Sequence, residues 1–321
     1  MIEDTSKHPI VSKLDVTYTA NIGSYLGVPI ILEDDTMFGT LCAVDPSPYQ
    51  FDKNDLELMQ TLADFIGNAI ELGRAYERIL AEEQRVKREL ELAKKVQTSV
   101  LSEPVSLENI NIHAYYQSSE SLSGDMYSWF EIAPNKYGII LIDVMGHGVS
   151  AALISMSIRS LLKGLITTVS EPTAVMKELN HHIYHLFNST QQSTYATAIY
   201  VAIDTELKTI ECVNAGHPSG IIFLDQLTVK KMDEGSMILG IFPELKVDKQ
   251  IFYYKDSTTV LLYTDGIIEL INPVINDAIK TLEDLMITEP NNVQLMEAIK
   301  QKYVNGKSLI DDICLIYVAV K

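Results

Sequence analysis

The feature that most restricts the fold of this chain is a stripe of apolar residues between residues 58 and 100. Consecutive members are alternately four and three residues apart: Leu58, Leu62, Phe65, Ala69, Leu72, Tyr76, Ile79, Glu83, Val86, Leu90, Ala93, Gln97 and Val100. Only Glu83 and Gln97 are polar, and they interrupt the apolar seam. This spacing places them on one side of a single helix, and about six heptads in one register favour a two-stranded coiled coil. The alternative is an amphipathic helix lying on its own domain. It fits less well, because the stripe is narrow and most intervening residues are charged.

This helix divides the chain into three predicted segments: a small α/β domain, a linker helix and a larger domain. The predicted boundaries are residues 1–75, 76–103 and 104–321. Pro104 should end the helix, because the residue before a proline disfavours helical backbone angles. In the first segment, GVPIILEDDTMFGTLCAVD predicts two strands joined by an Asp-rich turn, and Asp52 or Asn54 can cap the helix. The residues up to about Leu14 show no pattern and are expected to be disordered.

Strand and helix patterns are mixed beyond the linker. Strands are predicted in NIHAYYQSSE, YGIILIDV, TYATAIYVAID, TIECVNAG, SGIIFL, QIFYYKD, TTVLLYTDG and ICLIYVAV. Helices are predicted in SAALISMSIRSLLKGLI, PTAVMKELNHHIYHLFN, AIKTLEDLMI and NVQLMEAIKQKY. Because strands outnumber helices and short turns join several of them, the predicted fold class is α+β with antiparallel sheets.

Charge and composition exclude several classes of protein. The net charge is -18, from 25 basic and 43 acidic residues, and so acidic a surface repels the phosphates of nucleic acid. No apolar run approaches the roughly 20 residues that span a membrane, and the N-terminus lacks the pattern of a signal peptide. Cys42, Cys212 and Cys314 are scattered, as is typical of core thiols in a reducing compartment. We therefore expect a cytoplasmic protein that binds neither nucleic acid nor a membrane.

Acidic residues lie next to several apolar strands of the larger domain. Asp125 precedes one, Asp143 follows GIILI, Asp265 follows VLLYT, and Asp311 and Asp312 precede ICLIYV. A carboxylate buried against an apolar strand is costly unless it is paired or bound to a cation, and Lys and Arg are sparse nearby. Any one of these acids alone could be a turn former or a helix cap. Together they favour an oxygen-only site for a hard divalent cation.

The stretch ILIDVMGHGVSAAL, residues 140–153, has the form of a strand, a turn and an alanine-rich helix. Asp143 at the end of the strand is a candidate metal ligand. Gly146 and Gly148 allow the backbone to turn tightly and to approach an ion without a Cβ in the way.

Several histidines are further candidates for functional residues. His147 is either a proton donor near the site or a polar turn residue. His217, in NAGHPSG, is expected to be a turn residue. Zinc at His181, His182 and His185 is disfavoured, because no cysteine lies nearby.

Six segments then carry a family resemblance through their order: SGDMYSW, DVMGHGVSAAL, NAGHPSG, LGI, YTDGIIE and DDICLIYV. Together they resemble the bacterial metal-dependent serine/threonine phosphatases of the protein phosphatase 2C-like (PPM) family, in the branch of the sporulation and stress phosphatases SpoIIE, RsbU and RsbP. The resemblance covers about residues 90–321, and LAKKVQTSVL resembles the helix that precedes the catalytic domain in that branch. Residues 25–71 resemble the second half of a GAF domain, so the first segment is expected to be a partial GAF-like sensor domain.

The resemblance implies an α-β-β-α sandwich with a binuclear Mn²⁺ or Mg²⁺ centre at one edge. The implied ligands are the carboxylates of Asp125, Asp143, Asp265 and Asp311 and the backbone carbonyl of Val144. Asp312 is the less favoured acid of its pair, because the family often has Asn there. The implied reaction is direct hydrolysis of a phosphoester by metal-activated water. Asp143 would bridge the metals, and His147 is the candidate proton donor.

The chain departs from the family pattern at two positions. Ser128 occupies a place where this branch often has a further acid, and Cys314 occupies a place where Thr or Ser is common. The phosphate-binding arginine of the eukaryotic branch has no counterpart. None of these departures removes an implied metal ligand.

The resemblance also implies a function and partners. The chain is expected to be a protein serine/threonine phosphatase acting on a phosphorylated STAS-type anti-sigma-factor antagonist in stress or sporulation signalling. It is expected to be a homodimer through the linker helix and to be controlled by its N-terminal domain. One alternative is a non-catalytic signalling adaptor with a phosphatase-like fold, which the intact acids disfavour. Another is a metal-dependent hydrolase of small phosphate esters.

Overall fold

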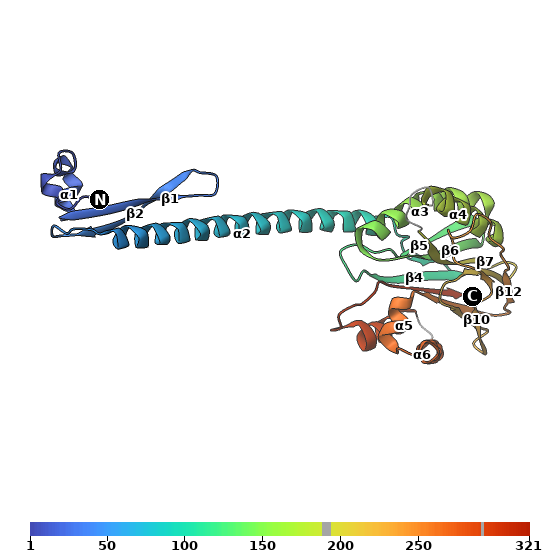
Figure 1. Ribbon diagram of the computed structural model, residues 1–321. Helices are drawn as coiled ribbons and strands as arrows, with labels where there is room; N and C mark the ends of the chain where they lie inside the picture. Colours follow the sequence, from blue (N-terminus) through green and yellow to red (C-terminus); the bar gives the residue numbers. More distant parts are fainter. Residues whose placement is uncertain (188–193, 290–291) are drawn as a thin grey trace. The chain divides into compact units, whose positions relative to one another are not determined.

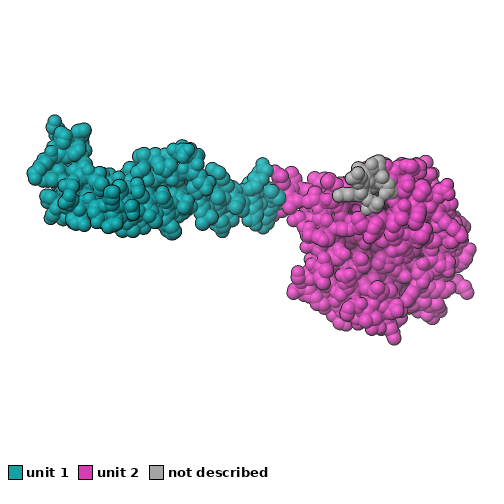
Figure 2. Space-filling view, viewed as in Figure 1, with its two compact units in different colours: residues 1–88 teal, residues 89–321 magenta. Residues whose placement is uncertain are grey.

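The structure is a computed structural model that describes residues 1–187, 194–289 and 292–321. The chain divides into two compact units, Met1–Arg88 and Glu89–Lys321, which are coloured separately in Figure 2. The division falls inside one helix, α2 (Lys53–Ser99), so each unit contains part of it.

The first unit begins with three short helical elements, η1 (Thr5–Lys7), η2 (Val11–Lys13) and α1 (Asp15–Thr19). These turns replace the disorder expected up to Leu14. An antiparallel hairpin follows, formed by β1 (Ser24–Ile31) and β2 (Met37–Asp45) (Figure 1). The Asp-rich turn predicted between two strands is present, and the carboxylate of Asp34 accepts a hydrogen bond from the backbone N–H of Thr36 (3.1 Å).

The hairpin packs on the N-terminal part of α2. Alternate residues of β1 are buried, among them Val28 and Ile30, and these contact Ala63 on the helix. The start of α2 has a reciprocal cap, because the backbone N–H of Asp55 donates to the Asp52 carboxylate (2.9 Å) and that of Asp52 donates to the Asp55 carboxylate (3.0 Å). Asp52 is therefore the cap that the sequence offered.

Helix α2 is continuous from Lys53 and ends at Ser99, shortly before Pro104. Between residues 58 and 86, most members of the apolar stripe are exposed to solvent. The exposed members are Leu58, Leu62, Phe65, Leu72, Tyr76, Ile79 and Val86. Its last turns differ, because Leu90 and Ala93 are half-buried and Gln97 is buried. The stripe therefore has two different environments along one helix.

Strands and helices of the second unit follow one another in runs along the chain. Its elements are β3 (Val105–Ser106), β4 (Ile110–Gln117), β5 (Met126–Ala133), β6 (Lys136–Val144), α3 (Gly148–Val169), α4 (Pro172–Phe187), β7 (Ala196–Asp204), β8 (Thr209–Ala215), β9 (Gly220–Leu224), β10 (Thr228–Met232), β11 (Gly235–Ser236), β12 (Gln250–Tyr253), β13 (Thr258–Tyr263), α5 (Asp265–Ile271), α6 (Ile275–Thr288), α7 (Asn292–Ile299), η3 (Lys300–Val304) and β14 (Ile313–Val320). Every strand and helix predicted in this region has a counterpart. The strands β3, β5, β10 and β11 and the helix α5 were not predicted as elements.

Two sheets pack face to face within the described residues. One has the strand order β10-β9-β13-β14-β4-β3, and the other has the order β11-β8-β7-β6-β5, with β12 paired to β8. Figure 1 shows α3 and α4 outside the second sheet and α5 and α6 outside the first. The result is the α-β-β-α sandwich that the family resemblance implied.

Strand β6 shows how the layers form. Ile139 and Leu141 point into the core between the sheets, whereas Ile140 and Ile142 belong to the core beneath α3 and α4. Because successive side chains of a strand point to opposite faces, a strand buried on both faces is apolar at nearly every position. This explains the unbroken run YGIILI.

Helix α3 is long and apolar enough to cross a membrane by length and composition alone, with a mean hydropathy of 1.5. The expectation that no apolar run reaches that length is therefore wrong for this segment. In the fold, α3 covers the second sheet, with Ile158, Leu162 and Ile166 buried against it. This packing accounts for the apolar residues on the buried face of α3, whereas Val149 and Leu153 are exposed.

Candidate metal centre and cleft

Strand pairing brings the predicted ligands together in two pairs. Strands β5 and β6 pair with Met126 opposite Ile142, so Asp125 and Asp143 are adjacent at the end of one sheet. In the other sheet, Asp265 follows β13 and Asp311 precedes β14, and these two strands are also paired. The acids of both sheets lie at the same end of the sandwich, close enough that Asp265 and Asp311 raise the pKa of Asp143.

Asp125 is nearly fully buried, and its Oδ2 atom has no hydrogen-bond partner among the described residues. The residue before it must be glycine, because a Cβ at Gly124 would lie 2.8 Å from the carbonyl oxygen of Val144. That carbonyl is the one predicted to be a ligand. The backbone thus brings this carbonyl oxygen close to the residue that directly precedes Asp125.

The acids of the centre lie close together, and burial and mutual repulsion raise the pKa values of three of them. Burial, and then the charge of Asp143, raise the pKa of Asp125 well above its usual value. Burial together with the charges of Asp265, Asp311 and Asp312 raises the pKa of Asp143 to about 7. Burial also raises the pKa of Asp265, with Asp311 and Glu269 adding to the effect. Among the described residues, no ion pair with Lys, Arg or His involves these carboxylates.

Asp312 has a different environment from its neighbours. Its carboxylate accepts hydrogen bonds from the backbone N–H of Ser119 (2.7 Å), the hydroxyl of Ser119 (2.8 Å) and the backbone N–H of Gly124 (3.0 Å). It therefore ties the loop before Asp125 to the start of β14. Asp311 is half-buried and accepts a hydrogen bond from the backbone N–H of Asp312 (2.7 Å).

The turn between β6 and α3 has the predicted geometry. Gly146 and Gly148 have φ angles of 86° and 77°, in the region that favours glycine. His147 lies between them at the N-terminus of α3. It is exposed, and its Nδ1 lies 2.8 Å from a carboxylate oxygen of Glu120.

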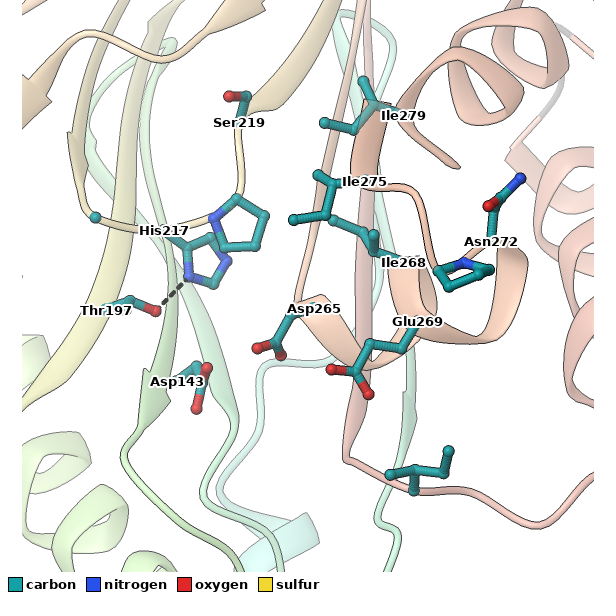
Figure 3. Close-up of a pocket in the computed structure, with 14 residues that line it drawn as sticks. Asp143, Thr197, His217, Ser219, Asp265, Ile268, Glu269, Asn272, Ile275 and Ile279 are labelled. Atoms are coloured by element: carbon teal, nitrogen blue, oxygen red, sulfur yellow. Dashed lines mark hydrogen bonds between the residues drawn. The ribbon is translucent and has the colours of Figure 1, made fainter. Parts of the chain in front are cut away.

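A cleft of about 740 Å³ opens beside the carboxylates (Figure 3). Asp143, Asp265 and Glu269 line it, together with His217 and residues of α5 and α6. Figure 3 shows the two aspartates facing each other across the lower part of the view, with His217 beside them.

His217 contributes a side chain to this cleft that the sequence did not reveal. It lies in a turn, as expected, and the turn is held by Asn214, which accepts from the backbone N–H of His217 (2.7 Å) and donates to its carbonyl (2.8 Å). The imidazole is nevertheless buried, and its Nδ1 lies 2.8 Å from the hydroxyl of Thr197. Thr197 is the register partner of Asp143. Burial lowers the pKa of His217 to about 3, so it is neutral at pH 7.

The end of α2 is fixed to the loop before Asp125. The side-chain amide of Gln97 donates to the carbonyl of Ser123 (2.7 Å), and its oxygen accepts from the backbone N–H of Ser123 (3.2 Å). The hydroxyl of Ser123 in turn accepts from the backbone N–H of Asp125 (3.0 Å). The interpretation of Gln97 as a polar member of a seam between two helices is therefore wrong, because its partners lie within its own unit.

These donors fit hard divalent cations. They are oxygens only. Among the residues that the structure describes, one of these oxygens is a buried carboxylate atom without a partner, and no cationic side chain forms an ion pair with these acids. As placed, no three His, Cys, Asp or Glu side chains of the described residues form a ready-made metal cluster. This also holds for His181, His182 and His185 on α4, although the rings of His181 and His185 are 4.2 Å apart.

The fold and these acids define a phosphatase domain of the PPM type. Residues 133–321 match the family described as Stage II sporulation protein E (SpoIIE), and residues 1–70 match the GAF domain. The chain therefore belongs to the SpoIIE family, with a GAF domain in its N-terminal part. The family resemblance of both segments is confirmed.

Curated and solved relatives agree with this assignment. Phosphoserine phosphatase RsbP of Bacillus subtilis (strain 168) is 39% identical over 237 residues, which are 73% of this chain and 58% of RsbP. The chain thus spans little more than half of that relative. Among solved structures, the SiaA-PP2C domain of Pseudomonas aeruginosa has a TM-score of 0.61 at 18% identity, covering 74% of this chain and 98% of that one. RsbX in complex with magnesium has a TM-score of 0.55 at 17% identity, covering 68% and 99%.

Proposed function

We propose that the second unit is a metal-dependent protein phosphatase that hydrolyses phosphoserine and phosphothreonine. The observation that carries this proposal is the meeting of buried and half-buried carboxylates from both sheets beside an open cleft, with raised pKa values and no cationic partner among the described residues. So many acids raise the free energy of the fold unless cations offset them. Such a charge distribution suits a centre that acts on phosphate through cations.

The proposed ligands are the carboxylates of Asp125, Asp143, Asp265 and Asp311 and the carbonyl of Val144. When bound, two Mn²⁺ or Mg²⁺ ions supply an activated water and neutralise charge on the phosphoryl group. Asp143 lies between the acids of the two sheets, which suits it to bridge the ions. Membership of the PPM family and the magnesium complex of RsbX, a relative in fold, support this choice of metal.

Other side chains position and complete the centre. Asp312 and Gln97 hold the loop that carries Asp125, through Ser119, Gly124 and Ser123. His147, paired with Glu120 on the exposed turn, is proposed as a proton donor to the leaving group.

The proposed substrate is a phosphorylated STAS-type anti-sigma-factor antagonist, and the proposed setting is cytoplasmic stress or sporulation signalling. The family resemblance and the likeness to RsbP, a phosphoserine phosphatase, support this choice. The free thiols support a reducing compartment, because none of the three cysteines, all of which lie in the described residues, forms a disulfide.

The proposed control element is the linker helix, residues 76–103, between the GAF-like segment (1–75) and the phosphatase domain (104–321). The exposed apolar residues of α2, Tyr76 and Ile79 among them, support a homodimer through this helix. Glu83 is a polar residue in that seam, and polar seam residues weaken the packing between two helices. Two arrangements of the helix pair can then be close in free energy, so a signal from the GAF-like segment needs little free energy to shift between them.

Phosphate release from a phosphorylated antagonist and from p-nitrophenyl phosphate, each with and without Mn²⁺, tests the proposal. We expect Mn²⁺-dependent release from the phosphoprotein, with a higher kcat/KM than for the small ester. Asp265→Asn should abolish both activities. Asp256→Asn is the matched control, because Asp256 is an exposed turn residue outside the cleft. A wild-type protein that releases no phosphate from either substrate, while binding the phosphoprotein, would instead be an adaptor.

A further inference from the structure

One wall of the cleft beside the carboxylates is apolar. It is formed by four isoleucines, which we call the isoleucine wall: Ile268, Ile275, Ile279 and Ile310. In Figure 3, Ile268, Ile275 and Ile279 lie along one side of the cleft, and His217 and Ser219 lie on the other. Asp265 and Glu269 lie at the foot of the same side. The wall is thus continuous with the carboxylate centre.

Two members of the wall are unusually accessible. Ile275 is 62% exposed and Ile310 is 78% exposed, whereas Ile268 and Ile279 are buried and form the base of the wall. Large apolar side chains that are exposed in a concave site next to polar groups are typical of recognition surfaces.

The sequence of α6 explains why Ile275 is exposed. The helix buries Ala278, Ile279, Leu282 and Met286 in the core beside the first sheet. Ile275 precedes Ala278 and Ile279 by three and four positions, so it lies on the same face of the helix. It is the first residue of that face, and it lines the cleft. The stripe that anchors α6 therefore continues into the cleft.

The charge of the cleft restricts its occupant. The ionisable side chains that line it are Asp143, Asp265 and Glu269, with His217, which is neutral at pH 7. The lining, as far as the structure describes it, contains no Lys or Arg. Bound cations would offset the charges of Asp143 and Asp265 but not that of Glu269. An acidic side chain beside the phosphorylated residue would therefore meet an acid and no cationic side chain, whereas an apolar one would be buried against the isoleucines.

We propose that the isoleucine wall is the docking surface for an apolar side chain that flanks the phosphoserine of the protein substrate. This inference rests on the proposed phosphatase function and specifies its substrate class: segments with an apolar residue next to the phosphoserine and no acid beside it. The cleft volume of about 740 Å³ accommodates a short peptide segment in addition to the phosphoryl group.

A set of three phosphopeptides tests the substrate class. They share one sequence and differ at the residue after phosphoserine, which is Leu, Ser or Glu. With Mn²⁺ present, we expect the Leu peptide to have a KM about 10-fold lower than the Ser peptide, which corresponds to about 1.4 kcal/mol. The Glu peptide should be the poorest substrate. A wild-type enzyme with equal KM values for the Leu and Ser peptides would overturn the proposal.

Two variants locate the surface. Ile275→Ser and Ile310→Ser should each reduce the ratio of the Ser-peptide KM to the Leu-peptide KM towards 1, and neither should unfold the protein, because both side chains are exposed. Ile287→Ser is the matched control, because Ile287 is an exposed isoleucine of α6 that does not line the cleft. Its ratio should remain about 10. A ratio unchanged in both cleft variants would rule out this docking surface.

A second measurement keeps docking separate from catalysis. Fluorescence anisotropy with the labelled, dephosphorylated Leu peptide measures the affinity of binding without turnover, and Ile275→Ser should lower this affinity. If no substrate releases phosphate but this binding is present and depends on Ile275, the proposed activity fails while the docking surface stands. If Ile275→Ser instead changes the sedimentation of the protein without changing peptide binding, the wall is a contact between copies of the chain and the proposal fails.

Discussion

Asp125 and Asp312 are each 3% exposed and lie at the same end of the sandwich, but they differ in how many hydrogen bonds their carboxylate oxygens accept. The carboxylate of Asp312 accepts three hydrogen bonds, from Ser119 and Gly124. An oxygen of Asp125 accepts none among the described residues. Burial alone therefore does not identify a metal ligand. A buried acid whose oxygens have donors holds the fold, and one without donors is a candidate to bind a cation.

This difference extends to two groups of residues. The first is the carboxylate centre, Asp125, Asp143 and Asp265, in which burial and mutual repulsion raise all three pKa values. The second is the loop brace, formed by Asp312 and Gln97 with their backbone partners. Changes in the carboxylate centre should therefore affect activity far more than stability, and changes in the brace should lower stability directly.

The largest effect is expected for Asp143→Asn. It should lower kcat by more than about 100-fold, because residues that merely orient metal ligands already cost roughly 10- to 100-fold when removed. The melting temperature in EDTA should stay the same or rise, because the substitution removes one charge from a group of repelling acids. Phosphate release at saturating Mn²⁺ and thermal unfolding in EDTA measure the two effects. Near-normal turnover in the variant would contradict the ligand assignment.

The next effect concerns pH. The folded-state pKa of Asp143 is about 7, above its ordinary value of 3.8. A raised pKa means that the folded state binds the proton more tightly, so this stabilisation is complete below pH 3.8 and is lost as pH rises through about 7.

The protein in EDTA should therefore melt at a lower temperature at pH 8 than at pH 5.5. Saturating Mn²⁺ should reverse the loss at pH 8, because it offsets the charges. Asp143→Asn, which does not titrate, should show a smaller pH dependence. A protein in EDTA that is equally stable at both pH values would show that these acids do not repel one another in the fold.

A smaller loss is expected in the loop brace. Asp312→Ala leaves the buried donors of Ser119 and Gly124 without an acceptor, which should lower the free energy of unfolding by roughly 2 kcal/mol. Asp312→Asn should recover about half of this, since its amide oxygen still accepts from Ser119. Urea unfolding of both variants in EDTA measures the difference. If Asp312→Ala is as stable as wild type but loses Mn²⁺ affinity, Asp312 is a ligand and not a brace.

The sequence predicted much of the second unit, because its strands are buried on two faces and its acids lie at strand ends. YGIILI, for example, is apolar at nearly every position, which predicts a strand buried on both faces, and Asp143 follows it directly. The place of His217 could not be predicted in this way. Its turn is local and visible in NAGHPSG, but its contact with Thr197 joins residues 20 positions apart and depends on strand register.

The helix α2 shows the same limit. A spacing of four and three predicts a helix and one of its faces, and α2 is indeed continuous. The spacing does not say what that face packs against, and this differs between Tyr76, which is exposed, and Gln97, which contacts Ser123. In the same way, the pattern around Asp265 indicated an acid after a strand but not that this acid begins the helix α5.

The smallest expected effect comes from comparing substitutions of the two polar residues of this stripe, Glu83 and Gln97. Glu83 is exposed, whereas Gln97 is buried with two hydrogen bonds to Ser123. If the exposed stripe is a dimer seam, Glu83→Leu adds an apolar side chain to it and should strengthen self-association. Gln97→Leu should leave self-association unchanged and lower the free energy of unfolding by about 1 kcal/mol, because the backbone of Ser123 loses its partners.

Sedimentation across a concentration series measures the self-association of each variant, and urea unfolding measures its free energy of unfolding. Equal self-association of wild type and Glu83→Leu at tens of micromolar, with both monomeric, would mean that the stripe is not a dimer seam.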